Sequence, residues 1–233
     1  MTYMGLVKEK LYGTVMDSPI TEQSPKTGRD HKRDAILDVA HAAFLADGYA
    51  ATSMSSIAAK VGGSKATLYN YFSSKEELFA AVIQEKCHAL QLRLFADGFD
   101  TDHIEAALTR LGERFLELVL TDEKTATYRM VAAEAGRFPE LGNAFFYSGP
   151  GAGVRHIGEY FERAIASGQL CAADSTLMAE QFLDLCKTGL YQQRILNIAS
   201  VTDDAAIKAN VANAVYVFLC AYGTGERPSP PWG

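Results

Sequence analysis

The sequence predicts an all-α fold, and three observations support this prediction. Apolar residues recur every three to four positions through most of the 233 residues, which is the period of an amphipathic helix. The alternating pattern of half-buried strands is missing, as are hairpin pairs such as Asn-Gly. A hydrophobic content of 48% is enough for a sizeable buried core.

Residues 1–28 are expected to form a flexible extension, because Gly and Pro occur there among Ser and Thr without an apolar period. The first helix is expected to start at Asp30, with Ile36 and Phe44 on its buried face. It should end at Gly48, since glycine readily adopts the left-handed conformation that terminates helices.

Two short helices are expected next. Ser53 can cap the first of them, which turns Ile57 and Val61 inward, although Ser56 stands where a capping box would have Glu or Gln. The turn V-G-G-S then leads into the second short helix, which begins at Ser64.

This second short helix is too short to be stable alone in water. Leu68 and Phe72 are four positions apart, which places them on one face, while Ala66 and Asn70 point the opposite way. We therefore expect Leu68 and Phe72 to clamp the helix to its neighbours and its outward face to be available for a partner.

A long fourth helix is expected to start with a capping box of Ser74 and Glu77. We interpret the sequence G-P-G-A-G from Gly149 as a flexible loop, and the Gly- and Pro-rich residues 223–233 as a flexible tail. The apolar stripe of the fourth helix is Phe79, Ile83, Cys87, Leu90 and Leu94. Further helices are expected over residues 102–120, 121–136, 138–147, 154–167, 174–198 and 202–222.

The last expected helix is apolar on nearly all sides, so it needs cover from two directions. One cover is the core of its own domain, and the simplest second cover is another copy of the same helix in a two-fold bundle. The alternative is the central helix of a monomer. The residues expected at a dimer interface are Ile207, Val211, Val215, Phe218 and Leu219.

The charges are unevenly placed in a chain of net charge -6. Residues 1–95 contain 11 Lys and Arg against 10 Asp and Glu, whereas residues 96–233 contain 11 against 18. An anionic partner such as nucleic acid is therefore expected to approach only the first part.

The four cysteines are widely spaced, and neither zinc-type spacing nor any other metal or cofactor motif is found, so we expect no cofactor. Buried thiols in a reducing cytoplasm are the favoured interpretation, and a redox switch is the alternative. The N-terminus lacks a secretory signal pattern, and the longest apolar run, residues 214–222, is shorter than the ~20 residues of a membrane helix. These patterns predict a soluble cytoplasmic protein.

The helix at 53–61, the glycine turn and the helix from Ser64 make a helix-turn-helix, which lays its second helix in the major groove of DNA. The segment A-F-L-A-D-G-Y through F-A-A-V, within residues 34–82, resembles the DNA-binding domain of the TetR family of transcriptional regulators. Gly63 departs from the family pattern, which usually has Val or Ile there. The positions that carry the resemblance are Phe44, Gly48, Tyr49, Thr52, Ile57, Ala58, Gly62, Ser64, Leu68, Tyr69, Phe72, Lys75 and Leu78.

The resemblance implies a helix-turn-helix domain at residues 29–80 and a helical regulatory and dimerisation domain at residues 81–222. Phosphates, guanine edges and thymine methyls are chemically suited to Lys, Tyr, Ser and Thr on such a helix. Basic residues that open the first helix can follow phosphates or enter a minor groove. The expected DNA-binding residues are Arg29, Lys32, Ser53, Ser64, Lys65, Ala66, Thr67, Tyr69, Asn70, Tyr71 and Lys75.

The segment from Tyr128 to Pro150 is similar to the ligand domain of the AefR-like and AcrR-like branches, which implies a pocket for a small inducer. Ligand sites are mostly apolar with a few polar anchors. Candidate anchors are His88, Glu134, Arg155 and His156, although each is at least as well explained as an ordinary surface or core polar group. The expected pocket residues are His88, Leu92, Phe115, Met130, Phe146, Phe161 and Phe182.

The leading hypothesis is a homodimeric repressor at the bacterial nucleoid, released from a palindromic operator by a small hydrophobic or amphipathic ligand. The alternative is a DNA-binding dimer without a small-molecule inducer, associated with the chromosome or controlled by a protein. An enzyme on a helical scaffold finds little support, because no nucleophile–base pair, metal spacing or cofactor loop is found.

Overall fold

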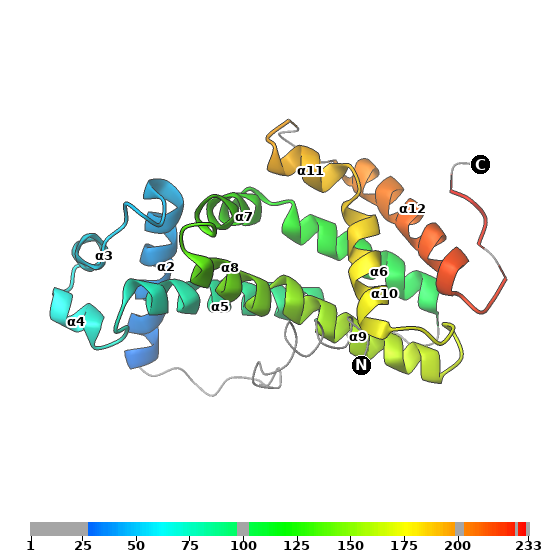
Figure 1. Ribbon diagram of the computed structural model, residues 1–233, viewed down its shortest axis with the longest axis horizontal. Helices are drawn as coiled ribbons and strands as arrows, with labels where there is room; N and C mark the ends of the chain where they lie inside the picture. The colour runs from blue at the N-terminus through cyan, green and yellow to red at the C-terminus, as the bar shows by residue number, and fades with distance from the viewer. Residues whose placement is uncertain (1–27, 97–102, 199–202, 227, 232–233) are drawn as a thin grey trace. The chain divides into compact units, whose positions relative to one another are not determined.

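The computed structural model describes residues 28–96, 103–198, 203–226 and 228–231, and within them the chain is helical and contains no strand (Figure 1). The all-α prediction is confirmed. In the N-terminal part the helices are α2 (Gly28–Asp47), α3 (Met54–Val61), α4 (Lys65–Tyr69) and α5 (Lys75–Leu94). They are followed by α6 (Ile104–Val119), α7 (Asp122–Glu134), α8 (Pro139–Ser148), α9 (Pro150–Ala166), α10 (Ser175–Lys187), α11 (Leu190–Ile195) and α12 (Asp204–Tyr222).

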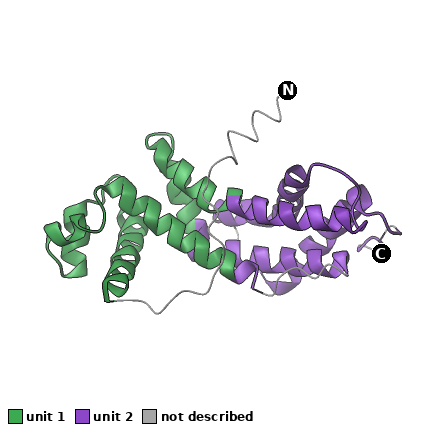
Figure 2. Ribbon diagram, turned by 90° about the horizontal axis from the view of Figure 1, so that it is seen from below, with its two compact units in different colours: residues 1–92, 126–151 green, residues 93–125, 152–233 purple. Residues whose placement is uncertain are grey.

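The chain divides into two compact units, coloured separately in Figure 2. Unit 1 contains the described residues up to 92 together with residues 126–151, and unit 2 contains the described parts of 93–125 and 152–233. The first unit is therefore larger than the helix-turn-helix segment of residues 29–80, because α8 and most of α7 share its core.

The helix ends in the first part of unit 1 follow the local signals. Gly48 ends α2 with a φ of 78°, and Gly62 ends α3 with a φ of 72°, so both turns use the left-handed conformation that favours glycine. Ser53 caps α3 and accepts a hydrogen bond from the backbone N–H of Ser56. The Ser56 hydroxyl completes the capping box from the other side, so serine performs the part expected of Glu or Gln.

The helix α4 is a single short turn with Ser64 as its cap. Leu68 and Phe72 are 2% and 3% exposed, which confirms that both are anchors. Phe72, however, lies beyond the end of α4 and not on it. The turn continues through hydrogen bonds from the N–H groups of Tyr71 and Phe72 to the carbonyl of Leu68, and this turn brings the ring inward.

The start of α5 is capped differently from the expected box. The Ser74 hydroxyl accepts a hydrogen bond from the Glu77 N–H at 3.1 Å, as predicted. The Glu77 carboxylate does not return to Ser74 but accepts hydrogen bonds from the N–H and hydroxyl of Ser73. These bonds, the hydroxyl bond first, lower the pKa of Glu77.

Two predicted boundaries in the later helices are wrong. Residues 150–153 open α9 and are not a loop, because Pro150 is suited to the first helical position, where the missing N–H costs no hydrogen bond. The stretch 174–198 is not one helix, because Gly189, at a φ of 77°, separates α10 from α11.

The residues directly after α12 are held by hydrogen bonds, in contrast to the expected flexible tail. Gly223 pairs with Leu170 in an isolated bridge, and the N–H of Thr224 donates to the carbonyl of Gln169 at 3.3 Å. The chain therefore leaves α12 along the segment that connects α9 to α10.

The core of unit 2 is built where α12 packs against α6 and α10. The rings of Phe161, Phe182 and Phe218 form its centre, with centroid distances of 5.1 Å to 6.3 Å. The five residues that we expected at a dimer interface, Ile207, Val211, Val215, Phe218 and Leu219, are all buried within this single chain. That part of the dimer prediction is corrected: α12 turns its strongest apolar stripe to its own core, and only its other face remains for a partner.

The burial of this stripe also explains why α12 is apolar. Among the described residues α12 is the one helix that is long and apolar enough to cross a membrane by length and composition. A core helix passes the same test, and the packing of α12 against α6 and α10 accounts for its composition.

The expectation of buried thiols holds for one cysteine of the four. Cys186 is fully buried, and burial raises the pKa of its thiol to about 12. Cys87, Cys171 and Cys220 are partly exposed thiols.

Candidate nucleic-acid interface

The outward face of α4 is available to a partner. Lys65, Ala66 and Asn70 are exposed, and Tyr69 is 43% exposed although it is a large ring. Thr67 is half-buried. The structure therefore brings these five expected residues together on one short surface, and the buried Leu68 holds that surface from behind.

Cationic side chains lie beside aromatic rings around this surface. The Lys65 ammonium is 5.7 Å from the centre of the Tyr69 ring, and the Arg29 guanidinium is 5.7 Å from the centre of the half-buried Tyr71 ring. Arg33 stands over Phe72 in the same way, at 5.6 Å. Such contacts orient the cations at the start of α2 toward the turn that follows α4.

Both serines that we expected to contact DNA, Ser53 and Ser64, act as helix caps within the chain. The Ser53 hydroxyl accepts from the N–H of Ser56, and the Ser64 hydroxyl accepts from the N–H of Thr67, each at 3.1 Å. The Ser64 and Thr67 hydroxyl oxygens are 2.9 Å apart. Both serines remain exposed, so their hydroxyl groups lie at the surface where α3 and α4 begin.

Lys32 lies exposed in the second turn of α2, whereas Lys75 is engaged inside the domain. The Lys75 ammonium donates to the carbonyl of Tyr49 at 2.9 Å and to that of Thr52 at 3.1 Å. It also lies 4.2 Å from the centre of the Tyr49 ring. The contact of Lys75 with DNA stays a prediction, and two of the three N–H donors of its ammonium are used within unit 1.

Sequence reasoning missed the part that Tyr49 plays beneath this surface. Its ring is fully buried and packs against Phe44, Phe79 and Phe138 at centroid distances of 5.0 Å to 5.6 Å. Its hydroxyl donates to the Glu76 carboxylate at 3.3 Å. Burial, and next the Glu76 charge, raise the pKa of Tyr49 well above its usual range.

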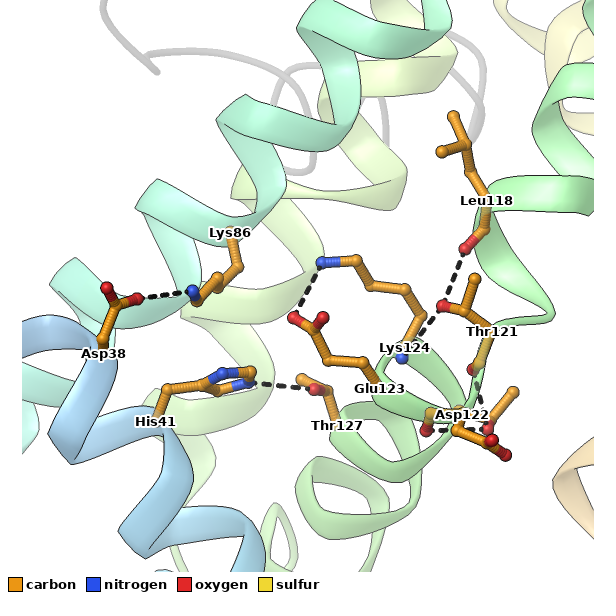
Figure 3. A network of polar contacts seen from close by, with 10 residues as sticks. Asp38, His41, Lys86, Leu118, Thr121, Asp122, Glu123, Lys124 and Thr127 are labelled. Atoms are coloured by element: carbon orange, nitrogen blue, oxygen red, sulfur yellow. Dashed lines mark hydrogen bonds and ion pairs between the residues drawn. The ribbon is translucent and has the colours of Figure 1, made fainter.

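Polar contacts also hold α5 within unit 1 (Figure 3). Lys86 on α5 forms an ion pair of 2.8 Å with Asp38 on α2. In the same unit α2 also contacts α7, where His41 Nε2 lies 3.3 Å from the Thr127 hydroxyl. Further along α5, the Gln91 amide donates to the carbonyl of Ser148 at 2.9 Å. A shift of α5 within this unit would have to rearrange the contacts of Lys86 and Gln91.

The expected ligand residues are divided between the two units. Phe161 and Phe182 are fully buried in the core of unit 2, where both rings pack against Phe218. Phe115 of unit 2 is half-buried, as are His88, Met130 and Phe146 of unit 1, and Leu92 is exposed.

The polar candidates for ligand anchors occupy ordinary positions. Glu134, Arg155 and His156 are half-buried, and the His156 ring packs edge-on against Phe95 within unit 2. A cavity of about 770 Å³ in unit 2 lies beside the first turn of α6, and none of the residues proposed for the pocket lines it. It is lined by His103, Ile104, Glu105, Ala106, Thr109, Arg110, Gly168, Gln169, Thr224 and Gly225.

Comparison with known proteins identifies the family. The description "Bacterial regulatory proteins, tetR family" matches residues 36–82, and "AefR-like transcriptional repressor, C-terminal domain" matches residues 106–224, which is half of the chain. The chain belongs to the TetR family. The match at residues 36–82 covers the helix-turn-helix of α3 and α4.

Similar proteins of known structure support this membership over nearly their whole length. The Flavonoid-responsive Regulator FrrA is 35% identical, and the match covers 85% of this chain and 99% of that protein at a TM-score of 0.72. A TetR-family regulator from Mesorhizobium loti is 25% identical with a TM-score of 0.76, covering 85% and 100% of the two chains.

Two further relatives differ in what they match. The HTH-type transcriptional regulator BetI of Rhizobium meliloti is 28% identical over 217 residues, which cover 88% of this chain and 98% of BetI. The HTH-type transcriptional activator FasR of Mycolicibacterium smegmatis is 46% identical over 56 residues, 24% of this chain and 26% of FasR. The TetR-family chain described here is accordingly a DNA-binding transcriptional regulator and not an enzyme.

Proposed function

We propose that the protein is a dimeric transcriptional repressor that binds a palindromic operator in the cytoplasm and leaves it when a small apolar or amphipathic ligand binds. The observation that carries the DNA part is the exposed face of α4, on which Lys65, Tyr69 and Asn70 project while Leu68 is buried behind them. A polar helix held in this way can enter a major groove without unfolding its support.

Each exposed residue has a chemical role in this proposal. Lys65 reaches a phosphate or a guanine edge, Tyr69 donates to a phosphate, and Asn70 is suited to adenine. Arg29 and Lys32 follow the backbone of the adjacent groove. Because residues 1–95 carry a net charge of only +1, attraction to random DNA should be weak at physiological salt, and two specific half-sites must supply most of the affinity.

The second copy is proposed to dock on the outer face of α12. Ala209, Asn213, Val217 and Ala221 are exposed at intervals of four residues, so they form one stripe opposite the buried stripe. Val217 is 43% exposed, and the small side chains of Ala209 and Ala221 on the same stripe would let two helices approach closely. A two-fold dimer would present one α4 helix to each of two half-sites ~34 Å apart.

Repression is proposed because the AefR-like repressor description matches residues 106–224, whereas the resemblance to the activator FasR is confined to a quarter of each protein. The ligand class is proposed from the chemistry of the expected pocket residues that are half-buried: the aromatic and sulfur side chains of Phe115, Met130 and Phe146, and the imidazole of His88. The flavonoid response of FrrA, which is 35% identical, favours the same class of small amphipathic aromatic molecule.

The ligand can release DNA only as far as it binds the DNA-incompetent arrangement more tightly than the competent one. The helix α5 is the proposed link, because Lys75 at its start touches the loop before α3, whereas Gln91 near its end touches α8. Ligand-dependent displacement of α5 would change how the two α4 helices are spaced.

The first test selects bound sites from random duplexes with the wild-type protein and measures mobility shifts on the enriched duplex. Enrichment of a palindrome supports the proposal, and no preference over random duplex would contradict it. Tyr69→Ala should abolish the preference while leaving the fold intact, and the exposed Ala132→Ser on α7 is the matched control that should change neither.

The second test adds small aromatic and aliphatic amphiphiles, flavonoids among them, to the protein–duplex complex. Release by one of them at a concentration that leaves the fold intact supports ligand control. If the duplex is bound but no effector relieves binding, the alternative of a DNA-binding dimer controlled by a protein, or associated structurally with the chromosome, is favoured.

A further inference from the structure

We propose that the end of α11 is a docking surface for a second copy of this chain, formed by Leu196 and Ile198. This inference rests on the proposed function, because it names a second contact of the proposed dimer besides the outer stripe of α12. The helix α11 lies between α10 and α12 in the chain, and all three belong to unit 2 (Figure 1).

Leu196 and Ile198 are the most exposed large apolar side chains in the part of the chain that the structure describes. Leu196 is 62% exposed and Ile198 is 72% exposed, whereas Val217 on α12 is 43% exposed. A single apolar side chain at the surface is ordinary, but two of them within three residues indicate a place where apolar cover would be favourable.

The turn that carries these two residues has a defined backbone. The Ile198 N–H donates to the Gln193 carbonyl at 2.9 Å, and the Asn197 N–H donates to the Arg194 carbonyl at 3.2 Å. Asn197 is in the left-handed conformation, with a φ of 59°. Together these features make a Schellman motif, in which the residue after the left-handed one often packs on an apolar residue five or six positions before it.

Glutamines occupy those earlier positions in α11. Gln192 and Gln193 are both exposed, so the helix does not give Ile198 the apolar contact that often accompanies this turn. The turn therefore directs Ile198 to the surface, and an apolar contact from another molecule would take the place of the internal one.

The end of α11 is also anchored within its own unit. Arg194 is 5% exposed; its Nε donates to the carbonyl of Leu120 at 3.0 Å, and its guanidinium forms an ion pair with Asp122. These contacts join the last turn of α11 to the junction of α6 and α7. Because residues on a fixed turn lose less conformational freedom when a partner covers them, this anchoring favours association.

The proposed dimer needs more contact area than the outer stripe of α12 provides. A stable interface buries ~800 Å² on each partner and uses roughly 20–30 residues a side. The stripe consists of Ala209, Asn213, Val217 and Ala221, of which only Val217 is a large apolar side chain. Small side chains allow close approach but bury little apolar surface, so a second apolar contact on the same copy is expected.

The end of α11 lies within reach of that stripe. Ile198 is five residues before Asp203, the cap of α12, so the chain between them can span at most ~18 Å. Ala205, in the first turn of α12, is exposed and lies four positions before Ala209, so it extends the stripe toward this end of the helix. A second copy on the stripe is therefore well placed to cover Leu196 and Ile198.

The first test compares the double variant Leu196→Gln/Ile198→Gln with the wild type by analytical ultracentrifugation over a dilution series. Loss of two apolar contacts should raise the dimer dissociation constant about tenfold or more. Where dilution does not dissociate the dimer, subunit exchange between labelled and unlabelled protein should accelerate by the same factor. Ala132→Gln, at an exposed position on α7 of unit 1, is the matched control and should change neither quantity.

The second test identifies what covers the surface. A photoreactive benzoylphenylalanine at position 198 is irradiated in an equal mixture of ¹⁴N and ¹⁵N protein, and the cross-linked peptides are analysed by mass spectrometry. Cross-links between light and heavy chains support a second copy as the occupant. The same probe at position 132 is the control and should give no such cross-links.

An unchanged dissociation constant and exchange rate in the double variant would overturn the inference. Cross-links confined to one chain, or no cross-links in a protein that is dimeric, would overturn it as well. Circular dichroism checks that the variants are folded; if the double variant is not, Ile198→Gln and the cross-linking experiment decide.

The same measurements separate this inference from the proposed function. A wild-type protein that is monomeric at every concentration would contradict both. A dimer that is weakened by Val217→Glu but not by Leu196→Gln/Ile198→Gln would contradict the docking role of α11 and leave the proposed function in place.

Discussion

Leu68 and Tyr69 are adjacent in α4 but have opposite roles, one as a buried anchor and one as an exposed recognition residue. Their difference in exposure allows the two roles to be tested separately. Leu68 is 2% exposed and joins the core with Ile57 and Phe72, while Tyr69 is 43% exposed. Because a five-residue helix has little stability of its own, the apolar contact of Leu68 must hold the surface that Tyr69 presents.

Leu68→Ala is therefore expected to destabilise the protein by ~2–5 kcal/mol, the cost of a lost apolar contact and the cavity left behind. Tyr69→Ala is expected to change the free energy of unfolding by less than about 0.5 kcal/mol, as surface substitutions usually do. Thermal or urea unfolding measures both. Equal losses in the two variants would contradict the division between anchor and recognition residue.

At the scale of elements, local signals predicted more than long-range contacts did. The ends at Gly48, Ser53 and Ser64 could be predicted because a cap depends on neighbouring residues. The contacts of Lys75 could not, because its two carbonyl partners are 23 and 26 positions away and a lysine before an acidic pair looks like a solvated charge.

The apolar pattern of α12 predicted that a face of this helix is buried, but it could not predict which chain covers that face. A stripe indicates that a helix face will be covered but not by which chain, so Val211 and Phe218 were assigned to a second copy although α6 and α10 cover them. The candidate pocket stays a prediction for the same reason, because buried phenylalanines line a cavity or fill a core with equal hydrophobicity.

The start of α5 should make stability depend on acid. The hydrogen bonds from Ser73 lower the folded pKa of Glu77 below its ordinary value of about 4.5. A lowered folded pKa gives stability that is present above the unfolded pKa and is lost as pH falls through the folded pKa. Glu77→Gln should thus lower the melting temperature at pH 7 and flatten its decline below about pH 4.5. Parallel melting curves between pH 7 and 3 for the two proteins would contradict this.

The close approach of α6 and α12 gives another prediction at the same scale. A Cβ added at Gly112 would lie 2.8 Å from a Val211 methyl group and 3.2 Å from the Cys186 sulfur. Gly112→Ala should cost ~1–3 kcal/mol through overpacking. The matched control is Gly153→Ala within α9, where a Cβ meets nothing within 4 Å and where Ala should stabilise the helix by roughly 0.5–1 kcal/mol. Melting temperatures that move in the same direction would contradict the packing argument.

At the scale of the whole molecule, the question is which face of α12 can meet a second copy. The stripe of Ile207, Val211 and Phe218 is committed to the core of unit 2, so exposure limits the proposed interface to the stripe that contains Val217 and Ala221. A two-fold contact would place each Val217 near its counterpart, and a charge there would be repeated on both sides of the interface.

Val217→Glu is accordingly expected to shift the protein from dimer to monomer in analytical ultracentrifugation, because two buried carboxylates at one interface repel and lose hydration. Ala132→Glu on the exposed face of α7 adds the same charge outside this stripe and should leave the dimer intact. The monomer should retain its helical content, since Val217 is not part of the core. It should also lose the tight binding to a palindromic duplex that needs two α4 helices at once, leaving the weaker binding of one half-site. A Val217→Glu protein that remains dimeric and binds the duplex as the wild type does would exclude this face of α12 as the interface.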